Sequence, residues 1–252
     1  MTPLPHSGSR VRQATGALVA LAIGGLAALV APALSACGNV PIPEHVTEEQ
    51  VAKEVASKDP ARLLKGGNRI FFEDFNRDTL GDKWVLERLP AEPNPATWTL
   101  ENGWLRNSDA KNQGAWVKAI PETGDVRIEF LAASDKPATG RFPGDLKCEA
   151  FATEPAHEKG YSFINGGWNN TLDTIAKLGE HSADDKRKPA LPVVEGEVHR
   201  FAVIRDGEKL HFFRDDKHLY TFEDARLVKG PWFGFNNWLS NARFDELAVF
   251  TF

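Results

Sequence analysis

Short apolar runs separated by turns dominate the chain from residue 69 to the C-terminus. The runs are rich in β-branched and aromatic residues, and clusters of glycine, proline, asparagine and aspartate interrupt them about every ten residues. Residues 126–130 alternate apolar and charged side chains, as a strand with one buried face does. Because this stretch has no helical periodicity and no repeat, we expect an all-β fold, an antiparallel two-sheet sandwich.

The expected strands can be bounded from these patterns. They cover residues 69–75, 84–87, 97–100, 103–106, 115–119, 126–132, 145–153, 161–165, 171–177, 199–205, 209–214, 218–222, 232–235 and 243–252. Asp206-Gly207 and Asp215-Asp216 are expected to form tight turns that join three consecutive strands.

The first 36 residues have the composition of a secretory signal peptide. Residues 1–13 carry Arg10 and Arg12 but no acid, and residues 14–36 are almost wholly small and apolar. The run ends in Leu-Ser-Ala-Cys, which resembles the lipobox of bacterial lipoproteins. The resemblance implies that Cys37 is lipidated, becomes the first residue of the mature chain and anchors it to a membrane.

An uncleaved transmembrane anchor is the alternative, because the apolar run is nearly long enough to span a bilayer. Gly24, Gly25 and Pro32 weaken that alternative. Glycine rather than aspartate follows Cys37, which by resemblance to bacterial sorting habits favours the outer membrane over the inner one.

Residues 37–68 are expected to form a tether between the lipid anchor and a sandwich domain at residues 69–252. Residues 47–50, Thr-Glu-Glu-Gln, have the form of a capping box that opens a helix through about Ser57. Such a helix is too short to be stable alone.

The composition argues against a nucleic-acid partner. Without the signal peptide the chain holds 28 basic and 35 acidic residues, a net charge of −7. Nucleic-acid binding depends on clustered lysine and arginine, whereas the densest basic run here, residues 186–188, follows two aspartates and is expected to be a solvated loop. With Cys37 lipidated only Cys148 remains, so we expect no disulfide and no cysteine metal site, and Cys148 should be a buried thiol.

Three motifs carry a resemblance to a known fold. Residues 71–84 read FFEDFNRDTLGDKW, residues 98–105 read WTLENGWL, and residues 242–250 read ARFDELAVF. In this order and spacing they resemble the concanavalin A-like lectin/glucanase jelly roll, found in laminarinase-type glycosidases, laminin G-like modules and 3-keto-disaccharide hydrolase-type domains. The resemblance covers residues 70–252 and implies two curved sheets with ligands on the concave one, but the fold by itself fixes no activity.

Two distant segments contain residues suited to sugar recognition. Residues 161–181 include Gly-Gly-Trp-Asn-Asn and end in Glu-His, and residues 232–238 read WFGFNNW. An indole ring packs against the apolar face of a sugar, and an asparagine amide both donates to and accepts from hydroxyls. The alternative is a sheet core with asparagines in its turns. The expected stacking residues are Trp168, Trp232 and Trp238, and the expected hydrogen-bonding residues are Asn165, Asn169, Asn170, Asn236 and Asn237, with Glu180 and His181 at the rim.

Two sets of side chains are candidates for catalysis. Laminarinase-type hydrolases carry E-x-D-x-x-E on a concave strand, and Glu149 and Glu154 have that spacing, with Phe151 in place of the central aspartate. Strict alternation would put the two glutamates on opposite faces unless a bulge intervenes, so exposed acids on a strand are the alternative interpretation. Glu180 and His181 form the second set, suited to acid–base work, including lyase-type proton abstraction, or to solvation in a loop.

The resemblance also implies a possible structural calcium ion. In some laminarinase-like jelly rolls an aspartate of the last strand and backbone carbonyls near the opening strand and a turn glycine hold the ion. The matching positions are Asp245, the neighbourhood of Glu73, and Gly103, and hard oxygen ligands suit Ca²⁺.

The sequence therefore favours a lipid-anchored jelly roll of the cell envelope that binds carbohydrate or polysaccharide on its concave face. One alternative is an enzyme acting on the same face, a glycoside hydrolase or polysaccharide lyase. Another is an envelope scaffold that docks a protein partner and has no sugar site. The sequence does not indicate an oligomeric state.

Overall fold

The computed structural model describes residues 59–89, 96–135, 142–181 and 186–252. The chain divides into two units, Met1–His45 and Val46–Phe252, and every described residue belongs to the second. The predicted signal peptide, the lipidation site Cys37 and the predicted helix that starts at residue 47 lie outside the described residues. Within those four ranges, no helix is long and apolar enough to cross a membrane.

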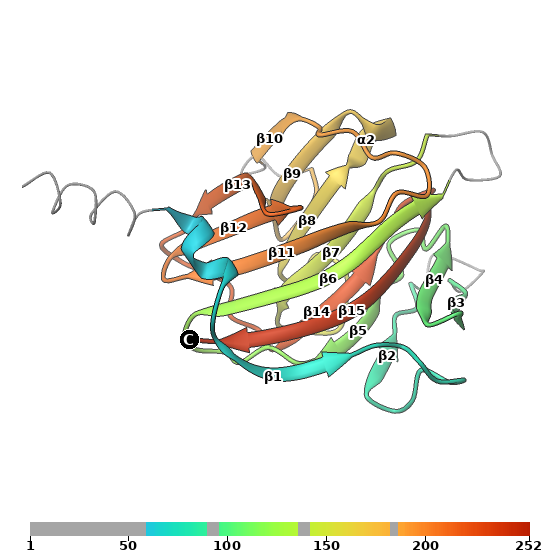
Figure 1. Ribbon diagram of the computed structural model, residues 1–252, viewed down its shortest axis with the longest axis horizontal. Helices are drawn as coiled ribbons and strands as arrows, with labels where there is room; N and C mark the ends of the chain where they lie inside the picture. The colour runs from blue at the N-terminus through green and yellow to red at the C-terminus, as the bar shows by residue number, and fades with distance from the viewer. Residues whose placement is uncertain (1–58, 90–95, 136–141, 182–185) are drawn as a thin grey trace, which may run out of the picture. The chain divides into compact units, whose positions relative to one another are not determined.

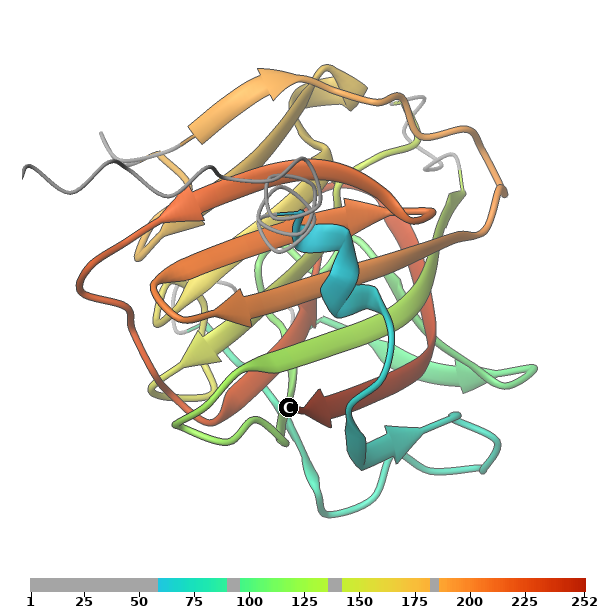
Figure 2. The same cartoon turned by 60° about the vertical axis from the view of Figure 1, so that its left-hand side comes forward.

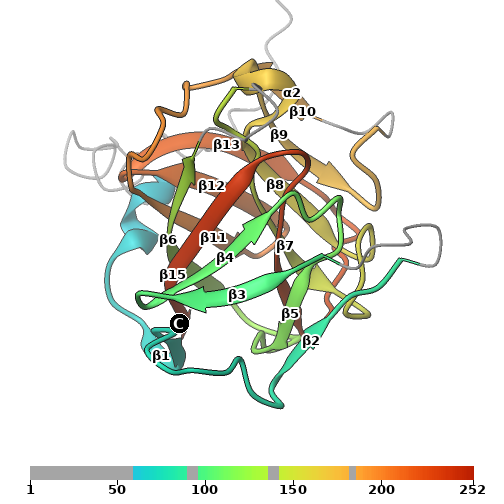
Figure 3. The same cartoon turned by 90° about the vertical axis from the view of Figure 1, so that its right-hand side faces the viewer.

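Two antiparallel sheets lie face to face (Figure 1), which confirms the predicted all-β sandwich. The larger sheet holds, in spatial order, β13 (Lys217–Glu223), β12 (Lys209–Arg214), β11 (His199–Asp206), β6 (Val126–Asp135), β15 (Asn241–Thr251), β4 (Trp104–Ser108) and β3 (Trp98–Glu101), with β1 (Asn68–Glu73) also paired to β15. The smaller sheet holds β10 (Lys186–Pro189), β9 (Leu172–Lys177), β8 (Tyr161–Gly166), β7 (Leu146–Ala152), β14 (Trp232–Asn236), β5 (Ala115–Lys118) and β2 (Trp84–Leu86). Figure 3 shows the β3–β4 hairpin beside β15 at one side of the sandwich.

Phenylalanine side chains fill the space between the sheets. Phe235 of β14 stacks on Phe244 of β15 with ring centroids 4.2 Å apart, and it meets Phe130 of β6 edge-on at 5.3 Å. All three rings are buried. Because aromatic pairs prefer such stacked and edge-to-face contacts, one ring of the smaller sheet holds two adjacent strands of the larger sheet together.

The described helical structure is limited to two turns, η1 (Pro60–Leu64) and α2 (Gly167–Asn170). The turn η1 lies across the outer face of the larger sheet (Figure 2). Asp59 caps it, because Oδ1 accepts a hydrogen bond of 2.9 Å from the amide of Ala61. The apolar side chains of η1 pack against Ala202, Ile204 and Phe213 of β11 and β12. The chain thus enters the sandwich on the side away from the smaller sheet.

Every strand expected from the sequence is present, with ends that differ by at most a few residues. Asp215 and Asp216, between β12 and β13, have φ angles of 51° and 60°, as a tight hairpin turn requires. Cys148 is buried, as expected. The expectation of a loop at residues 186–188 was wrong, because this charged run pairs with β9 as the edge strand β10. Charged residues are usual on exposed edge strands.

Candidate functional site

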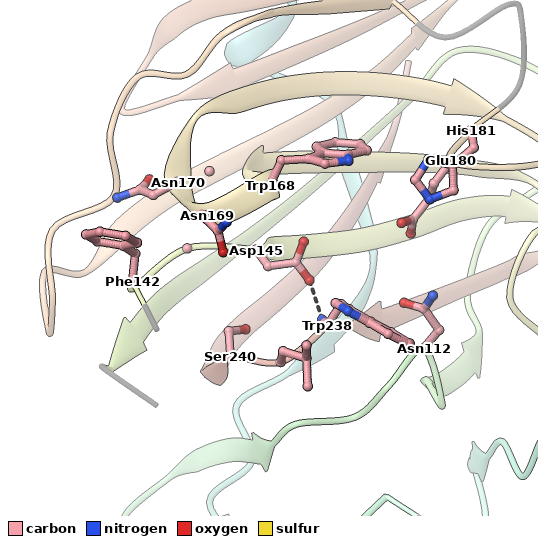
Figure 4. Close-up of a pocket in the computed structure, with 13 residues that line it drawn as sticks. Asn112, Phe142, Asp145, Trp168, Asn169, Asn170, Glu180, His181, Trp238 and Ser240 are labelled. Atoms are coloured by element: carbon pink, nitrogen blue, oxygen red, sulfur yellow. Dashed lines mark hydrogen bonds between the residues drawn. The ribbon is translucent and has the colours of Figure 1, made fainter. Parts of the chain in front are cut away.

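A pocket of about 330 Å³ opens on the smaller sheet, near the start of β7 and the ends of β8 and β14 (Figure 4). The volume is in the range of small-ligand sites. Figure 4 shows the rings of Trp168 and Trp238 on either side of the Asp145 carboxylate. The lining residues are Asn112, Phe142, Gly144, Asp145, Gly166, Trp168, Asn169, Asn170, Glu180, His181, Trp238, Leu239 and Ser240.

Much of the pocket wall has a left-handed backbone conformation. Trp168, Asn169 and Asn170 in α2 have φ angles of 49°, 62° and 64°, and Asn112 and Asp145 have φ angles of 62° and 50°. Asparagine and aspartate adopt this conformation readily, whereas for Trp168 it costs roughly 1–2 kcal/mol. Phe75 and Glu246, away from the pocket, have the same conformation, so it is not confined to the pocket. At Trp168 the fold tolerates that cost in a residue that faces the pocket.

Local hydrogen bonds hold α2 in this conformation. Asn170 binds the backbone of Val193 twice, from Nδ2 to the carbonyl oxygen at 2.7 Å and from the amide nitrogen to Oδ1 at 2.9 Å. A side chain at Gly144 would collide with the carbonyl oxygen of Gly166, so the loop before β7 can pass α2 this closely only with glycine. Asn170 thus positions the turn with its amide, and Trp168 and Asn169 extend from that turn.

The indole of Trp168 is fixed from two sides. The guanidinium carbon of Arg187 lies 4.4 Å from its ring centroid, and the ring of His181 lies 5.8 Å away, edge-on. Arg187 Nη2 also donates to the carbonyl oxygen of Glu180 at 2.7 Å. One residue of β10 therefore holds both the stacking ring and the segment that carries Glu180.

The end of β14 presents Trp238. Asn236 Nδ2 donates to Glu149 Oε1 at 2.8 Å, and Asn237 Nδ2 donates to the carbonyl oxygen of Ser240 at 2.8 Å. Both asparagines are fully buried, whereas Trp238 is 46% exposed. The two amides therefore shape the turn that places Trp238 at the pocket and are not themselves among the pocket-lining residues.

Five charged side chains, here called the pocket cluster, are linked at the pocket: Asp145 and Glu180 line it, and Lys147, Glu149 and His157 lie behind them. Lys147 Nζ donates to Glu180 Oε1 at 2.7 Å and lies 4.0 Å from Asp145 Oδ2. His157 Nδ1 donates to Glu149 Oε1 at 2.6 Å, and its Nε2 lies 3.9 Å from Glu180 Oε1. Lys147 and Glu149 are fully buried, whereas Asp145 and Glu180 line the pocket.

Burial and neighbouring charges push the pKa values of the two pocket carboxyls apart. Burial raises the pKa of Asp145 to about 6, with Lys147 acting against the rise and Glu180 adding to it. Burial also favours a higher pKa for Glu180, but the positive charges of Lys147 and His157 outweigh it and lower that pKa. Burial lowers the pKa of Lys147 and of His157, but the nearby carboxylates have the larger effect, and both pKa values are raised.

The structure places Asn165 away from the pocket, between the two sheets. Its Oδ1 accepts from Arg214 Nη1 of the larger sheet at 2.9 Å, and its Nδ2 donates to Asp173 Oδ1 at 2.6 Å. The carbonyl oxygen of Leu191 accepts from both Asn165 at 3.0 Å and Arg214 at 2.7 Å. We call Asn165, Asp173 and Arg214 the interior cluster.

A bulge in β7 decides the geometry of Glu149 and Glu154. Trp232 pairs with Ala152 and Gly234 pairs with Glu149, so β7 has one residue more than β14, and Phe151 has a φ angle of 59°. Glu149 is buried with His157, and Glu154 is exposed beyond the end of β7. Neither lines the pocket. Trp232 lies at the opposite end of β14 from Trp238.

The predicted calcium positions lie apart from the pocket. The Glu73 carboxylate accepts from Arg77 Nη1 at 2.8 Å and from Trp84 Nε1 at 3.3 Å, and Asp245 Oδ1 accepts from the next backbone amide at 2.7 Å. Gly103 occupies the β3–β4 turn. No group of three or more His, Cys, Asp or Glu side chains in the described ranges could hold a metal ion. The resemblance assigns most of the calcium ligands to backbone carbonyls, so the calcium ion stays a prediction.

Sequence reasoning missed three members of the pocket cluster: Asp145, Lys147 and His157. Lys147 had a usable signal, because with Glu149 it alternates with apolar residues and so puts two charges on one face of an otherwise apolar strand. Asp145 shared that signal, because it has the same parity at the start of the strand expected at residues 145–153. His157 had none, since a loop brings it to the cluster.

No family model matches the chain, and no curated protein matches it in sequence. Solved structures with the same fold are found. One, from work on endo-acting O-glycanases of the human gut microbiota, is 16% identical with a TM-score of 0.53, covering 73% of this chain and 99% of that chain. The laminarinase from Flavobacterium sp. UMI-01 is 15% identical with a TM-score of 0.52, covering 73% of this chain and 100% of that chain.

The carbohydrate-binding module CBM66 from Bacillus subtilis is 13% identical with a TM-score of 0.50, covering 67% of this chain and 96% of that chain. These likenesses establish the fold, the concanavalin A-like jelly roll that the motifs predicted.

Proposed function

We propose that this protein binds carbohydrate in the pocket, as a lipid-anchored protein of the bacterial cell envelope. One observation carries the proposal: two accessible indole rings, Trp168 and Trp238, share a pocket with two carboxylates, Asp145 and Glu180. A sugar ring offers the complementary surface, with apolar C–H faces for the indoles and hydroxyl groups that donate to carboxylates.

The position of the pocket supports a sugar ligand. Lys147, whose ammonium group contacts the lining residue Glu180, alternates along β7 with the core residue Cys148, so the pocket opens on the face of the smaller sheet that points away from the core. In this proposal that face is the concave ligand face. A carbohydrate-binding module and a laminarinase share the fold. Their likeness is one of fold alone, and the chemistry of the pocket is the argument for the ligand.

Retention of the full-length chain on a panel of insoluble and immobilised glycans tests the proposal. We expect one glycan class to retain the wild-type chain and to retain Trp238→Ala far less, because truncation removes an exposed stacking surface. Trp232→Ala is the matched control, at the other end of β14 from Trp238, and should be retained like the wild type. Equal retention of Trp238→Ala and wild type, or no retention on any glycan, would contradict the proposal and favour a protein-docking scaffold.

The membrane anchor and the outer-membrane location form a separate part of the proposal, supported by the lipobox-like sequence at Cys37. Mass spectrometry of the N-terminal peptide from an expressing bacterium should show a diacylglycerol mass on Cys37, and fractionation should recover the chain with the outer membrane. An unmodified Cys37, or a Cys37→Ser chain that still fractionates with membranes, would remove the anchor from the proposal.

A further inference from the structure

Two carboxyls of the pocket differ in the charge that surrounds them. Glu180 faces cations: Lys147 Nζ at 2.7 Å and His157 Nε2 at 3.9 Å from its Oε1, with His181 next to it in the chain. Such neighbours favour a carboxylate that stays ionised. Glu158 Oε1 lies 3.7 Å from the same Nε2 and accepts from the backbone amide of Glu180 at 3.4 Å.

Asp145 has fewer compensating partners. Lys147 is 4.0 Å from its Oδ2 and shared with Glu180, while the Trp238 amide donates to that same oxygen. Burial therefore dominates and raises the pKa of Asp145 to about 6, and His157 contributes only a small opposing effect. Asp145 holds a proton under mildly acidic conditions in which Glu180 does not.

General acid–base catalysis needs two neighbouring groups, one protonated and one ionised, and two carboxyls whose surroundings push their pKa values apart meet that need. Both oxygens lie within 4.0 Å of the Lys147 ammonium nitrogen, so both groups border the same part of the pocket. Glu149 and Glu154 do not offer this arrangement, because the first is fully buried and the second lies in an exposed turn.

We propose that the pocket hydrolyses a glycosidic bond of its bound sugar, with Asp145 as general acid and Glu180 as general base, an inference that rests on the proposed carbohydrate binding. Asp145 gives its proton to the glycosidic oxygen as the bond from that oxygen to the anomeric carbon breaks. Glu180 takes a proton from a water molecule whose oxygen bonds to the anomeric carbon. The products are two hydroxyl-bearing sugars, and solvent returns a proton to Asp145 and removes one from Glu180.

Lys147 and His157 are positioning residues in this scheme, because they touch Glu180 rather than the substrate. The rate should fall as pH rises through about 6, where Asp145 loses its proton.

The test measures release of reducing ends by the full-length chain from each glycan that retains it, and from the matching p-nitrophenyl glycoside. Glu180→Gln should lose about 100-fold or more on both substrates. Asp145→Asn should lose about as much on the glycan but far less on the nitrophenyl glycoside, whose leaving group needs no proton. Glu154→Gln is the control and should match the wild type.

Retention and release are scored separately, so that the two proposals fail in different ways. Glycan retention by the wild type without release of ends would overturn the hydrolysis and leave the binding intact. Rates of Asp145→Asn and Glu180→Gln equal to wild type would also overturn it. An absence of both retention and release would overturn the carbohydrate binding on which the inference rests. Retention of both variants on the glycan would show that they remain folded.

Discussion

The pocket cluster and the interior cluster both bury cations among carboxylates and amides, on opposite faces of the smaller sheet. In the interior cluster, Arg214 reaches from one sheet to Asn165 of the other, and backbone carbonyls accept from both side chains. In the pocket cluster, Lys147 is equally buried, but its partners Asp145 and Glu180 line an open pocket. Similar groups therefore join the sheets in one place and remain available to a ligand in the other.

The comparison predicts that the interior cluster controls stability. Arg214→Met leaves the Asp173 carboxylate and the Asn165 amide without their cationic partner, and removal of one partner from a buried charged network costs about 3–5 kcal/mol. Denaturant unfolding should show that loss in the free energy of unfolding. The remaining folded fraction should still bind the glycan. A decrease in the free energy of unfolding of less than about 1 kcal/mol would contradict this prediction, because it would mean that the interior cluster does not stabilise the fold.

Asp145→Asn should have the opposite effect on stability at neutral pH. Between the ordinary pKa of 3.8 and about 6, the folded chain binds more protons at Asp145 than the unfolded chain, so its contribution to stability falls as pH rises through that window. The variant should therefore gain on the order of 2 kcal/mol at about pH 7.5 and almost nothing at about pH 4, as denaturant unfolding at both pH values would show.

Asp224→Asn is the matched control, because we expect it to change the free energy of unfolding in the opposite direction from Asp145→Asn. Asp224 accepts from Lys177 Nζ and Tyr161 Oη, both at 2.6 Å, and these partners lower its pKa despite burial. Its contribution is present above the ordinary pKa and is lost as pH falls through the lowered one, so this variant should be destabilised at neutral pH. If both variants change the free energy of unfolding in the same direction at neutral pH, Asp145 and Asp224 do not differ as we predict.

Trp168→Gly should separate function from stability at the pocket. Glycine adopts the left-handed conformation of this position without steric cost, which offsets the lost packing of the indole. We expect glycan affinity to fall about tenfold, equivalent to about 1.4 kcal/mol, with little change in the free energy of unfolding. Calorimetric titration and denaturant unfolding measure the two quantities. A large decrease in the free energy of unfolding would contradict this prediction and show that Trp168 stabilises the fold.

Arg187→Ala should have the smallest effect. A cation over an indole contributes about 0.5–1 kcal/mol at exposed sites, so loss of the ring's support should weaken glycan binding about threefold by titration. Lys229→Ala, a charge change elsewhere on the surface, should leave affinity unchanged. If Arg187→Ala binds as tightly as the wild type, the ring of Trp168 does not depend on Arg187.

The strands were predictable because each depends on local alternation, which residues 126–130 display directly. The site was predictable only in part. Trp168 and Trp238 stand out as tryptophans in turn-like segments, and both line the pocket. Asn165 looked equally suitable, but side-chain orientation near the end of β8 sends it toward Arg214, and that partner is 49 residues away. The bulge at Phe151 likewise depends on pairing with β14, which no local pattern encodes.

Titration of ¹⁵N-labelled tryptophan indoles with an oligosaccharide of the retained glycan tests pocket binding most directly. Three indoles serve as internal controls, because Trp84, Trp98 and Trp116 donate to Glu73, Gln113 and Glu87 within the fold. Sugar binding in the pocket predicts that the Trp168 and Trp238 signals shift with saturation while these three stay fixed. Shifts confined to Trp104 or Trp232, or no saturable shift at Trp168 and Trp238, would contradict it.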